Sequence, residues 1–350
     1  MKHLLGIEIA VLVILVLAAI FIRLDADKPD DTTVKDPQQT TQAPVTTAPP
    51  ETTEVFAPQT TAPTETEVPT TPTWLIPEPD RDLSAQQYFV YDCDTDTFLV
   101  LSGKEDDRVE PASITKIFTA YVAMQYLEPT EEIKITDALD LVAAGSSTAR
   151  LDWGDVLTAE MLIEAMLLPS GNDAAYALAV AIGREIDEKP RENASVAAQT
   201  FMKEMNRQAK ELGMTGTNFV NPDGIHRTNH YSTLKDLAIM GKLALENETI
   251  MKYASTCEDK VTLSSGEVLE WENTNALIHP ESEYYCPYAL GLKTGQTPYA
   301  GSCLLSAFQY EGRELIIGVF GCAETNDRFV DTLQLFNAAI SAQTQTGEAE

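Results

Sequence analysis

The sequence contains few of the residues on which metal and cofactor chemistry depends. Its 350 residues include only four histidines and five cysteines. No His-Glu-x-x-His zinc pattern occurs, and His226 and His230, which follow Asn-Pro-Asp-Gly, are predicted to be surface loop residues. A histidine-based serine hydrolase has little support, because Gly-x-Ser-x-Gly is missing. We therefore expect no metal site and no cofactor.

The cysteines show neither a Cys-x-x-Cys pair nor another metal-ligand spacing. Cys303 and Cys322 lie in apolar, strand-like runs, where a free thiol usually acts as a small core residue. A disulfide between Cys257 and Cys286 remains open at this stage. None of the cysteines, Cys93 included, has the setting of a catalytic thiol.

Basic residues are scarce as well. The chain has 24 lysines and arginines against 54 aspartates and glutamates, which gives a formal net charge of −30. Most of this charge lies beyond residue 80, in the part that we expect to fold. A folded domain this acidic repels phosphate backbones, so the composition argues against nucleic acid as a partner.

One long apolar run stands near the start of the chain. Residues 4–22 are apolar apart from Glu8, which is long enough to cross a bilayer. Because no good small-x-small cleavage site follows, we favour an uncleaved anchor over a cleaved signal peptide for residues 1–24. The expected localisation is therefore the cell membrane, with a single span. The flanking charges, Lys2 on one side and Arg23 and Lys28 on the other, leave its orientation to the function that the later motifs indicate.

The next segment has almost nothing apolar to bury. Residues 32–73 contain 15 threonines and 8 prolines and no glycine. Such a composition cannot repay the entropy of ordering, so residues 25–79 are predicted to form a disordered stalk. A second disordered segment, a short tail, is expected at residues 343–350.

Strand and helix patterns alternate between residues 80 and 342. Strand-like runs at both ends of this region flank a part with helical periodicity. The arrangement predicts an α+β domain, with an antiparallel sheet flanked by helices and a helical subdomain inserted. Helices are expected at 158–168, 172–186, 195–212, 233–245 and 327–342, and strands at 88–92, 97–101, 289–292, 302–310 and 314–320.

The stretch best arranged for chemistry is Pro111-Ala112-Ser113-Ile114-Thr115-Lys116. In a helix that begins near Pro111, Ser113 and Lys116 share a face at i and i+3. The apolar residues that follow would bury the helix and desolvate Lys116, which favours the neutral amine that can take the proton of a serine nucleophile.

Ser-x-x-Lys alone is a weak signal, since Ser232-Thr233-Leu234-Lys235 has the same spacing. Two further motifs, Ser170-Gly171-Asn172 and Lys293-Thr294-Gly295, occur once each, and only Ser113 precedes both. The order Ser-x-x-Lys, Ser-x-Asn, Lys-Thr-Gly is typical of β-lactamases and penicillin-binding proteins. It selects Ser113 and leaves Ser232 or Thr233 as a helix cap.

With these motifs, the chain resembles the serine-type D-alanyl-D-alanine carboxypeptidases, the low-molecular-weight penicillin-binding proteins of peptidase family S11. The resemblance covers about residues 80–342 and implies a β-lactamase/DD-peptidase-like fold. It also implies a substrate, a peptidoglycan pentapeptide ending in D-Ala-D-Ala, and inhibition by β-lactam antibiotics. With that substrate, the catalytic domain is expected to be extracellular, on the cell-wall side of the membrane. Further segments that resemble the family are 212–214, 217–224, 273–275 and 300–303.

The resemblance also implies a role for each motif residue. Ser113 is then the acylated nucleophile, Lys116 its general base, Ser170 a proton relay to the leaving D-alanine, and Asn172 a partner of Lys116 or of the substrate amide.

The remaining roles fall to the Lys-Thr-Gly strand and a distant arginine. Lys293 and Thr294 would attract and bind the substrate carboxylate, while the residue after Gly295, Gln296, would add its backbone N–H to an oxyanion hole. Arg328 is expected either to meet the same carboxylate or to be a surface arginine.

Two alternatives share these motifs. A class A β-lactamase needs a glutamate that activates the deacylating water, and the comparable region, 219–224, has none. A non-catalytic wall-binding or drug-sensing module would be expected to have lost a motif residue, and none is lost. The sequence does not choose between carboxypeptidase, transpeptidase and endopeptidase activity, because all three proceed through the same acyl-serine.

Overall fold

The computed structural model describes residues 82–347, and the side chains up to residue 341. The predicted segment 1–24 and the predicted stalk 25–79 lie outside this range. The last helix, α8 (Asp327–Gly347), continues through the start of the tail predicted at 343–350.

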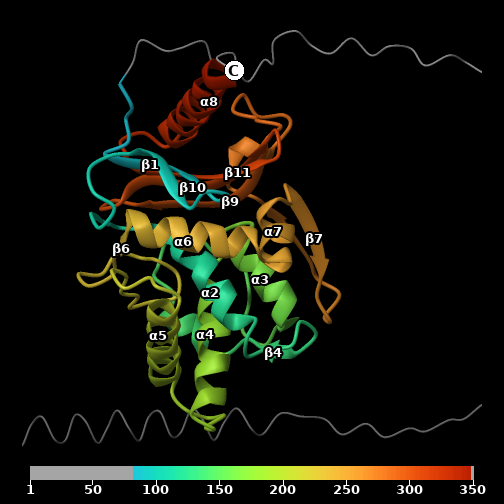
Figure 1. Cartoon of the computed structure of the whole chain (residues 1–350). Coiled ribbons are helices and arrows are strands. Elements are labelled where there is room, and N and C mark those ends of the chain that lie inside the picture. Colours follow the sequence, from blue (N-terminus) through green and yellow to red (C-terminus); the bar gives the residue numbers. More distant parts are fainter. Residues whose placement is uncertain (1–81, 348–350) are drawn as a thin grey trace, which may run out of the picture. The chain divides into compact units, whose positions relative to one another are not determined.

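A five-stranded antiparallel sheet forms the centre of the described part (Figure 1). Its strand order, β2-β1-β11-β10-β9, brings together strands from both ends of the domain, as the sequence predicts. The edge strand β9 pairs with β10, and Lys293 to Thr297 lie opposite Leu305 to Gly301. The strands are β1 (Gln87–Asp92), β2 (Thr97–Leu101), β9 (Ala289–Thr297), β10 (Gly301–Tyr310) and β11 (Arg313–Cys322).

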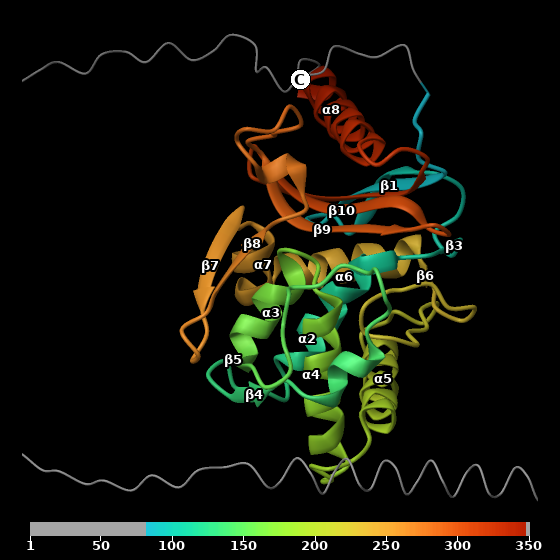
Figure 2. The same ribbon diagram turned by 180° about the vertical axis from the view of Figure 1, so that it is seen from behind.

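Helices cover both faces of this sheet, because its strands are apolar on both sides. Ile317 of β11 packs in the cluster that includes Phe336 of α8, whereas its neighbour Ile316 packs in the larger cluster on the opposite face. Figure 2 shows the two layers, with α8 on one face and α6 (Leu234–Leu245) across the other. Since both faces of the sheet are buried, the edge strand β9 has a rigid support.

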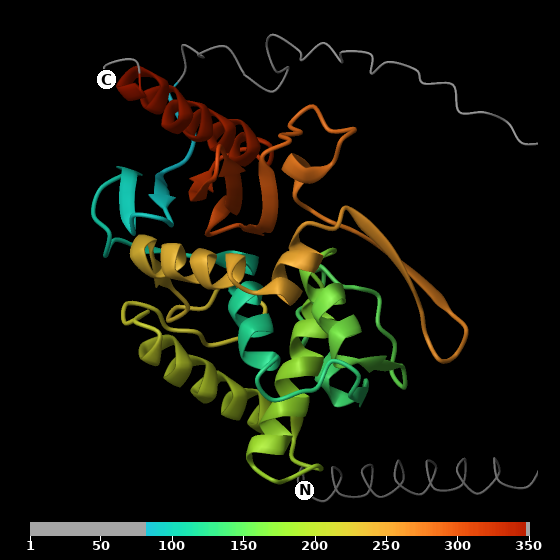
Figure 3. The ribbon, with the colours of Figure 1, turned by 45° about the vertical axis from the view of Figure 1, so that its right-hand side comes forward.

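The inserted helical subdomain follows β2 in the chain and lies on the α6 side of the sheet (Figure 3). At its centre α2 is buried on nearly all sides, and only Tyr121 among its residues is not fully buried. α4 and α5 pack closely, since a Cβ on Gly183 would overlap the backbone of Ala197. The helices are α2 (Thr115–Ala123), α3 (Ala159–Leu167), α4 (Asn172–Ile186), α5 (Ala194–Glu211) and α7 (Glu248–Ala254).

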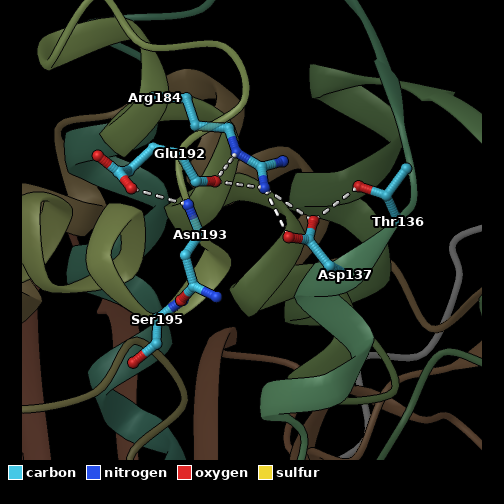
Figure 4. Close-up of polar contacts among 6 residues, drawn as sticks. All are labelled: Thr136, Asp137, Arg184, Glu192, Asn193 and Ser195. Atoms are coloured by element: carbon cyan, nitrogen blue, oxygen red, sulfur yellow. Dashed lines mark hydrogen bonds and ion pairs between the residues drawn. The ribbon is translucent and has the colours of Figure 1, made fainter.

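One arginine links three segments at the end of the helical subdomain that lies away from Asn172 (Figure 4). Arg184, near the end of α4, donates to both carboxylate oxygens of Asp137 (2.8 and 2.7 Å) and to the backbone oxygen of Glu192. Asn193 then caps α5 by accepting from the N–H of Ser195 at 2.9 Å. These bonds fix the turn between α4 and α5, so that α4 presents its opposite end, Asn172, in a defined position.

Several short elements complete the described part. Three two-stranded ladders pair β3 with β6, β4 with β5, and β7 with β8. Three turns of 3₁₀ helix, η1, η2 and η3, connect longer elements. Their bounds are β3 (Arg108–Val109), η1 (Ala112–Ile114), β4 (Glu132–Lys134), η2 (Asp137–Leu141), β5 (Val156–Thr158), β6 (Ser232–Thr233), β7 (Glu258–Thr262), β8 (Val268–Glu272) and η3 (Ala276–Ile278).

The localisation predicted from the sequence is corrected by the structure. Between residues 82 and 347, no helix is both long enough and apolar enough to cross a membrane. The longest of them, α8, has 21 residues, and its apolar side chains pack in the cluster on the sheet. The expected span at 4–22 lies outside the described residues, so a single-pass membrane protein is not supported and that prediction is withdrawn.

The five cysteines are all free thiols in the structure. Cys303 and Cys322 are fully buried, as predicted for core residues. The disulfide left open between Cys257 and Cys286 is not formed, and the Cys257 thiol instead donates to the backbone oxygen of Ile278.

Candidate active site

Ser113 lies in a strained turn at the start of α2. The helix expected from Pro111 begins as the 3₁₀ turn η1 and becomes α-helical at Thr115. Ala112, just before the serine, has a φ of +48°, which is unusual for a residue with a side chain. Such strain persists only where the surroundings enforce it, and it is frequent at functional sites.

Lys116 lies directly beneath Ser113 and has no exposed surface. Its Nζ donates to Ser113 Oγ at 2.9 Å and to the backbone oxygen of Asp223 at 2.8 Å. Burial lowers the pKa of Lys116 to about 8, although the charges of Asp223 and Asp173 partly oppose this shift. A substantial fraction of this amine is therefore neutral near pH 8 and placed to accept a proton from the serine hydroxyl.

The Ser-Gly-Asn motif enters the site at the start of α4. Ser170 has a φ of +63°, and a Cβ on Gly171 would come within 2.7 Å of the backbone oxygen of Ala165, so the tight turn requires the glycine. Asn172 is buried, and its Oδ1 has no hydrogen-bond partner in the described structure. An unpaired buried acceptor is costly, and a substrate amide or an ammonium could satisfy it.

The Lys-Thr-Gly motif lies within β9 rather than at its end. Lys293 is buried and donates to Thr274 Oγ1 at 3.3 Å. Burial, followed by the charges of Lys116 and Arg328, holds the pKa of Lys293 well below its ordinary value. Thr294 shares a 2.5 Å hydrogen bond with the same Thr274 hydroxyl, so one side chain links the two motif residues.

Gly295 allows β9 to approach the nucleophile. A Cβ at this position would lie 2.9 Å from both the Pro111 oxygen and the Ala112 Cβ, and 3.2 Å from the backbone nitrogen of Ser113. The next residue, Gln296, directs its side chain outward and donates to Thr325 Oγ1 at 3.2 Å. The strand therefore lies against the turn that holds Ser113.

Arg328 is not a surface arginine. It lies in the first turn of α8, is only 7% exposed, and donates to the backbone oxygen of Gly295 at 3.3 Å. Its Nε has no hydrogen-bond partner among the described residues, and burial lowers its pKa. The guanidinium thus retains an unused donor beside β9, as expected for a group that binds an anion.

A cavity of about 780 Å³ opens above Ser113. Lys116 and Lys293 lie beneath its walls, and the other predicted site residues line it directly: Ser113, Ser170, Asn172, Thr294, Gly295, Gln296 and Arg328. The structure thus brings all nine predicted residues to one place. Their individual roles remain predictions.

The second Ser-x-x-Lys sequence has a different environment. Ser232 is buried and shares a 2.8 Å hydrogen bond with Thr217, and Thr233 caps α6 by accepting from the N–H of Asp236. Lys235 points outward, half-exposed, to pair with Glu105. The prediction that this sequence is a helix start is confirmed, since α6 begins at Leu234 with Thr233 as its N-cap.

Sequence reasoning missed the support that the Asn-Pro-Asp-Gly loop gives the site. The backbone oxygen of Asp223 accepts from both Lys116 and Ser113, the latter at 3.3 Å.

The two histidines of this loop differ in environment. His230, predicted to be a surface residue, is buried and hydrogen-bonded to Thr115 at 2.9 Å. His226 lines the cavity, half-buried, and stacks on Tyr299 with ring centroids 3.9 Å apart. The prediction of surface loop histidines is therefore wrong for His230, because the loop folds back against α2.

The fold is that of the DD-peptidases. The crystal structure of the Streptomyces K15 DD-transpeptidase matches with a TM-score of 0.67 and 29% identity over 75% of this chain and 98% of that one. The ampicillin-bound penicillin-binding protein D2 of Listeria monocytogenes matches with a TM-score of 0.59 and 28% identity over 74% and 98%. The predicted fold class is confirmed.

The chain belongs to the D-alanyl-D-alanine carboxypeptidase family, peptidase S11, whose profile matches residues 74–324. It is 33% identical to the carboxypeptidase DacF of Bacillus subtilis over 70% of this chain and 60% of that protein. It is 32% identical to the D-alanyl-D-alanine carboxypeptidase of Streptomyces sp. strain K15 over 66% and 79%. The match thus spans three fifths of DacF and about four fifths of the Streptomyces protein.

Proposed function

We propose that this protein is a serine D,D-carboxypeptidase that removes the terminal D-alanine from peptidoglycan stem peptides and is acylated by penicillin. The observation that carries the proposal is the buried Lys116 amine, 2.9 Å from the Ser113 hydroxyl, with its pKa lowered to about 8. A serine without an adjacent base is a weak nucleophile at neutral pH. Family membership and the named activities of the relatives support the same reaction.

The reaction would begin with proton transfer from Ser113 Oγ to Lys116 Nζ. Oγ attacks the carbonyl carbon between the two D-alanines, and the oxyanion is stabilised by the backbone N–H groups of Ser113 and Gln296. Collapse expels the terminal D-alanine, whose amine takes a proton through Ser170. Water then hydrolyses the acyl-serine and restores the free enzyme.

The carboxylate of the leaving D-alanine would be recognised on β9. Thr294 supplies a hydroxyl and Arg328 its unused Nε donor. The buried Lys293 becomes the cationic partner when the carboxylate arrives, because a neighbouring negative charge raises its lowered pKa. Asn172, with its unpaired Oδ1, would accept a hydrogen bond from a substrate amide or from the protonated lysine.

A β-lactamase is the less favoured reading. Such an enzyme needs a carboxylate that faces the acyl-serine and activates water. No aspartate or glutamate is among the residues that line the cavity. The Asp223 carboxylate does not line it either, and instead accepts from the N–H of Ile225 at 3.2 Å.

The proposal is tested by incubating the protein with penicillin, measuring its intact mass, and mapping the modified peptide. One penicilloyl group is expected, on Ser113. Ser113→Ala should abolish labelling, and Ser232→Ala, which alters the matched Ser-x-x-Lys sequence, should leave it intact. In parallel, release of D-alanine from a D-Ala-D-Ala peptide is measured. Labelling at Ser232, or no D-alanine release, would contradict the proposal.

A further inference from the structure

The cavity above Ser113 differs in charge from the rest of this acidic chain. Its lining includes two arginines, Arg227 and Arg328, and one histidine, His226, but no carboxylate. Other cavities of the described part contain several: one is lined by Glu258, Asp259, Glu270 and Glu272, and another by Glu131, Glu132, Glu185 and Glu188. With acidic residues more than twice as frequent as basic ones, a wall without carboxylates favours an anionic ligand.

The proposed mechanism uses only one of these arginines. Arg328 is assigned to the carboxylate of the leaving D-alanine, whereas Arg227 has no assigned role. Arg227 is exposed at the cavity, forms no ion pair among the described residues, and donates one hydrogen bond, to the backbone oxygen of His226 at 3.0 Å. The neighbouring carboxylate of Glu110 is held by His226 Nδ1 at 2.8 Å. The guanidinium fork of Arg227 is therefore open toward the cavity.

The contact between the loop that carries Arg227 and the chain just after β9 indicates which part of a substrate this loop meets. The carboxylate end of the site lies at Lys293 and Thr294, and the scissile carbonyl at the N–H of Gln296. The strand then continues to Thr297, about 10 Å beyond Thr294 at 3.3 Å per residue. Two residues later Tyr299, which is 72% exposed, stacks on the ring of His226. His226 thus meets the chain beyond Gln296, on the side of the residues that precede the scissile bond, and its neighbour Arg227 lines the cavity beside it.

We propose that Arg227, beside the His226–Tyr299 stack, forms a subsite for a second carboxylate, on the side chain of the residue that precedes D-Ala-D-Ala. The inference rests on the proposed carboxypeptidase function and names its preferred substrate class, stem peptides with an anionic third residue. The exposed ring of Tyr299, held in place by its stack on His226, offers an apolar surface for the methylene groups of that side chain. Arg227 offers paired N–H donors for its carboxylate.

The test compares two N-acetylated tripeptides, Xaa-D-Ala-D-Ala, in which Xaa is L-2-aminopimelate or its ω-amide. The two differ only in the charge of the side-chain end. The wild-type protein should hydrolyse the carboxylate peptide with a kcat/KM about tenfold higher, mainly through a lower KM, and salt should reduce the difference. Arg227→Gln should remove the preference and leave kcat/KM for the amide peptide within twofold.

Arg150→Gln is the matched control. Arg150 is also an exposed arginine at a cavity, but that cavity is lined by carboxylates, so its variant should keep the preference. Equal hydrolysis of both peptides by the wild type, or an unchanged preference in Arg227→Gln, would overturn the subsite while leaving the carboxypeptidase function in place. Release of D-alanine from neither peptide would overturn both.

Discussion

Gly224 lies so close to Ala112 that a Cβ on the glycine would overlap the Ala112 carbonyl group and come within 2.9 Å of the Ser113 nitrogen. Gly224 also has a φ of +85°, a conformation that residues with a side chain rarely adopt. Both residues of this contact have positive φ, and both adjoin functional groups: Ser113 follows Ala112, and Asp223, whose carbonyl accepts from Lys116, precedes Gly224. The loop and the nucleophile turn therefore hold one another in place.

Gly224→Ala should damage both stability and acylation. The new methyl group meets backbone atoms that cannot move without displacing Ser113, so we expect a loss of more than about 3 kcal/mol and at least tenfold slower acylation by penicillin. Urea unfolding and the acylation rate measure the two effects. Gly266→Ala is the control, since Gly266 has nearly the same φ, +87°, with no atom within 4 Å of a new Cβ. It should lose only about 1 kcal/mol and acylate normally, and equal damage from both variants would contradict the contact argument.

The lowered pKa of Lys116 predicts the pH dependence of acylation. The reactive form is the neutral amine, so the rate should rise with pH, about tenfold per unit below pH 8, and level off above the pKa of about 8. Lys116→Ala should slow acylation by about 10² to 10⁴-fold. Lys235→Ala, the lysine of the second Ser-x-x-Lys sequence, should leave the profile unchanged. A rate that falls as pH rises from 6 to 8 would exclude Lys116 as the base.

The sequence predicted the architecture well where the periodicity was long. The helix predicted at 172–186 has the same bounds in the structure, and the strand ranges at both ends belong to one sheet. The short elements were missed: α7 has seven residues, and β4 and β5 three each. Segments of this length are shorter than the window over which helix or strand periodicity can be recognised, so tertiary pairing decides their conformation.

The predicted site residues converge, but their support could not be read from the sequence. The acceptor that holds Lys116 is the backbone oxygen of Asp223, and a backbone carbonyl has no residue-type signal. The burial of His230 and Arg328 depends on which surfaces cover a loop and the first turn of a helix. Thr274, which bonds to both Lys293 and Thr294, lies about twenty residues away along the chain.

His230 should make the protein sensitive to acid. Its Nδ1 accepts from the N–H of Val220, so its Nε2–H donates to Thr115, and burial lowers its pKa to about 3. An unfolded chain binds a proton at this histidine below its ordinary pKa of about 6.5, while the folded protein does not until pH 3. Stability is therefore lost as pH falls through this window, by about 3 kcal/mol between pH 6.5 and 4.

The measurement is urea unfolding of the wild type and of His230→Asn at several pH values. The variant should be less stable at pH 7, because it loses buried hydrogen bonds, but the two free energies of unfolding should converge toward pH 4. Carboxyl groups common to both proteins cancel in the difference. Curves that stay parallel from pH 7 to pH 4 would show that His230 does not cause the acid sensitivity.

The absence of carboxylates from the cavity lining predicts a long-lived complex with penicillin. After acylation, water must attack the Ser113 ester, and no aspartate or glutamate of the lining is available to activate it. A peptidyl group can still be released, since departure of the D-alanine makes room for water, whereas the opened ring of penicillin stays attached beside the ester. We expect the penicilloyl protein, followed by intact mass, to persist far longer than one carboxypeptidase turnover.

Asp223→Asn is the control. It keeps the backbone oxygen that accepts from Lys116 and a side-chain oxygen for the N–H of Ile225, so it should not change this lifetime. Rapid return of unmodified protein in the wild type, slowed by Asp223→Asn, would identify Asp223 as a deacylating base and favour a β-lactamase instead.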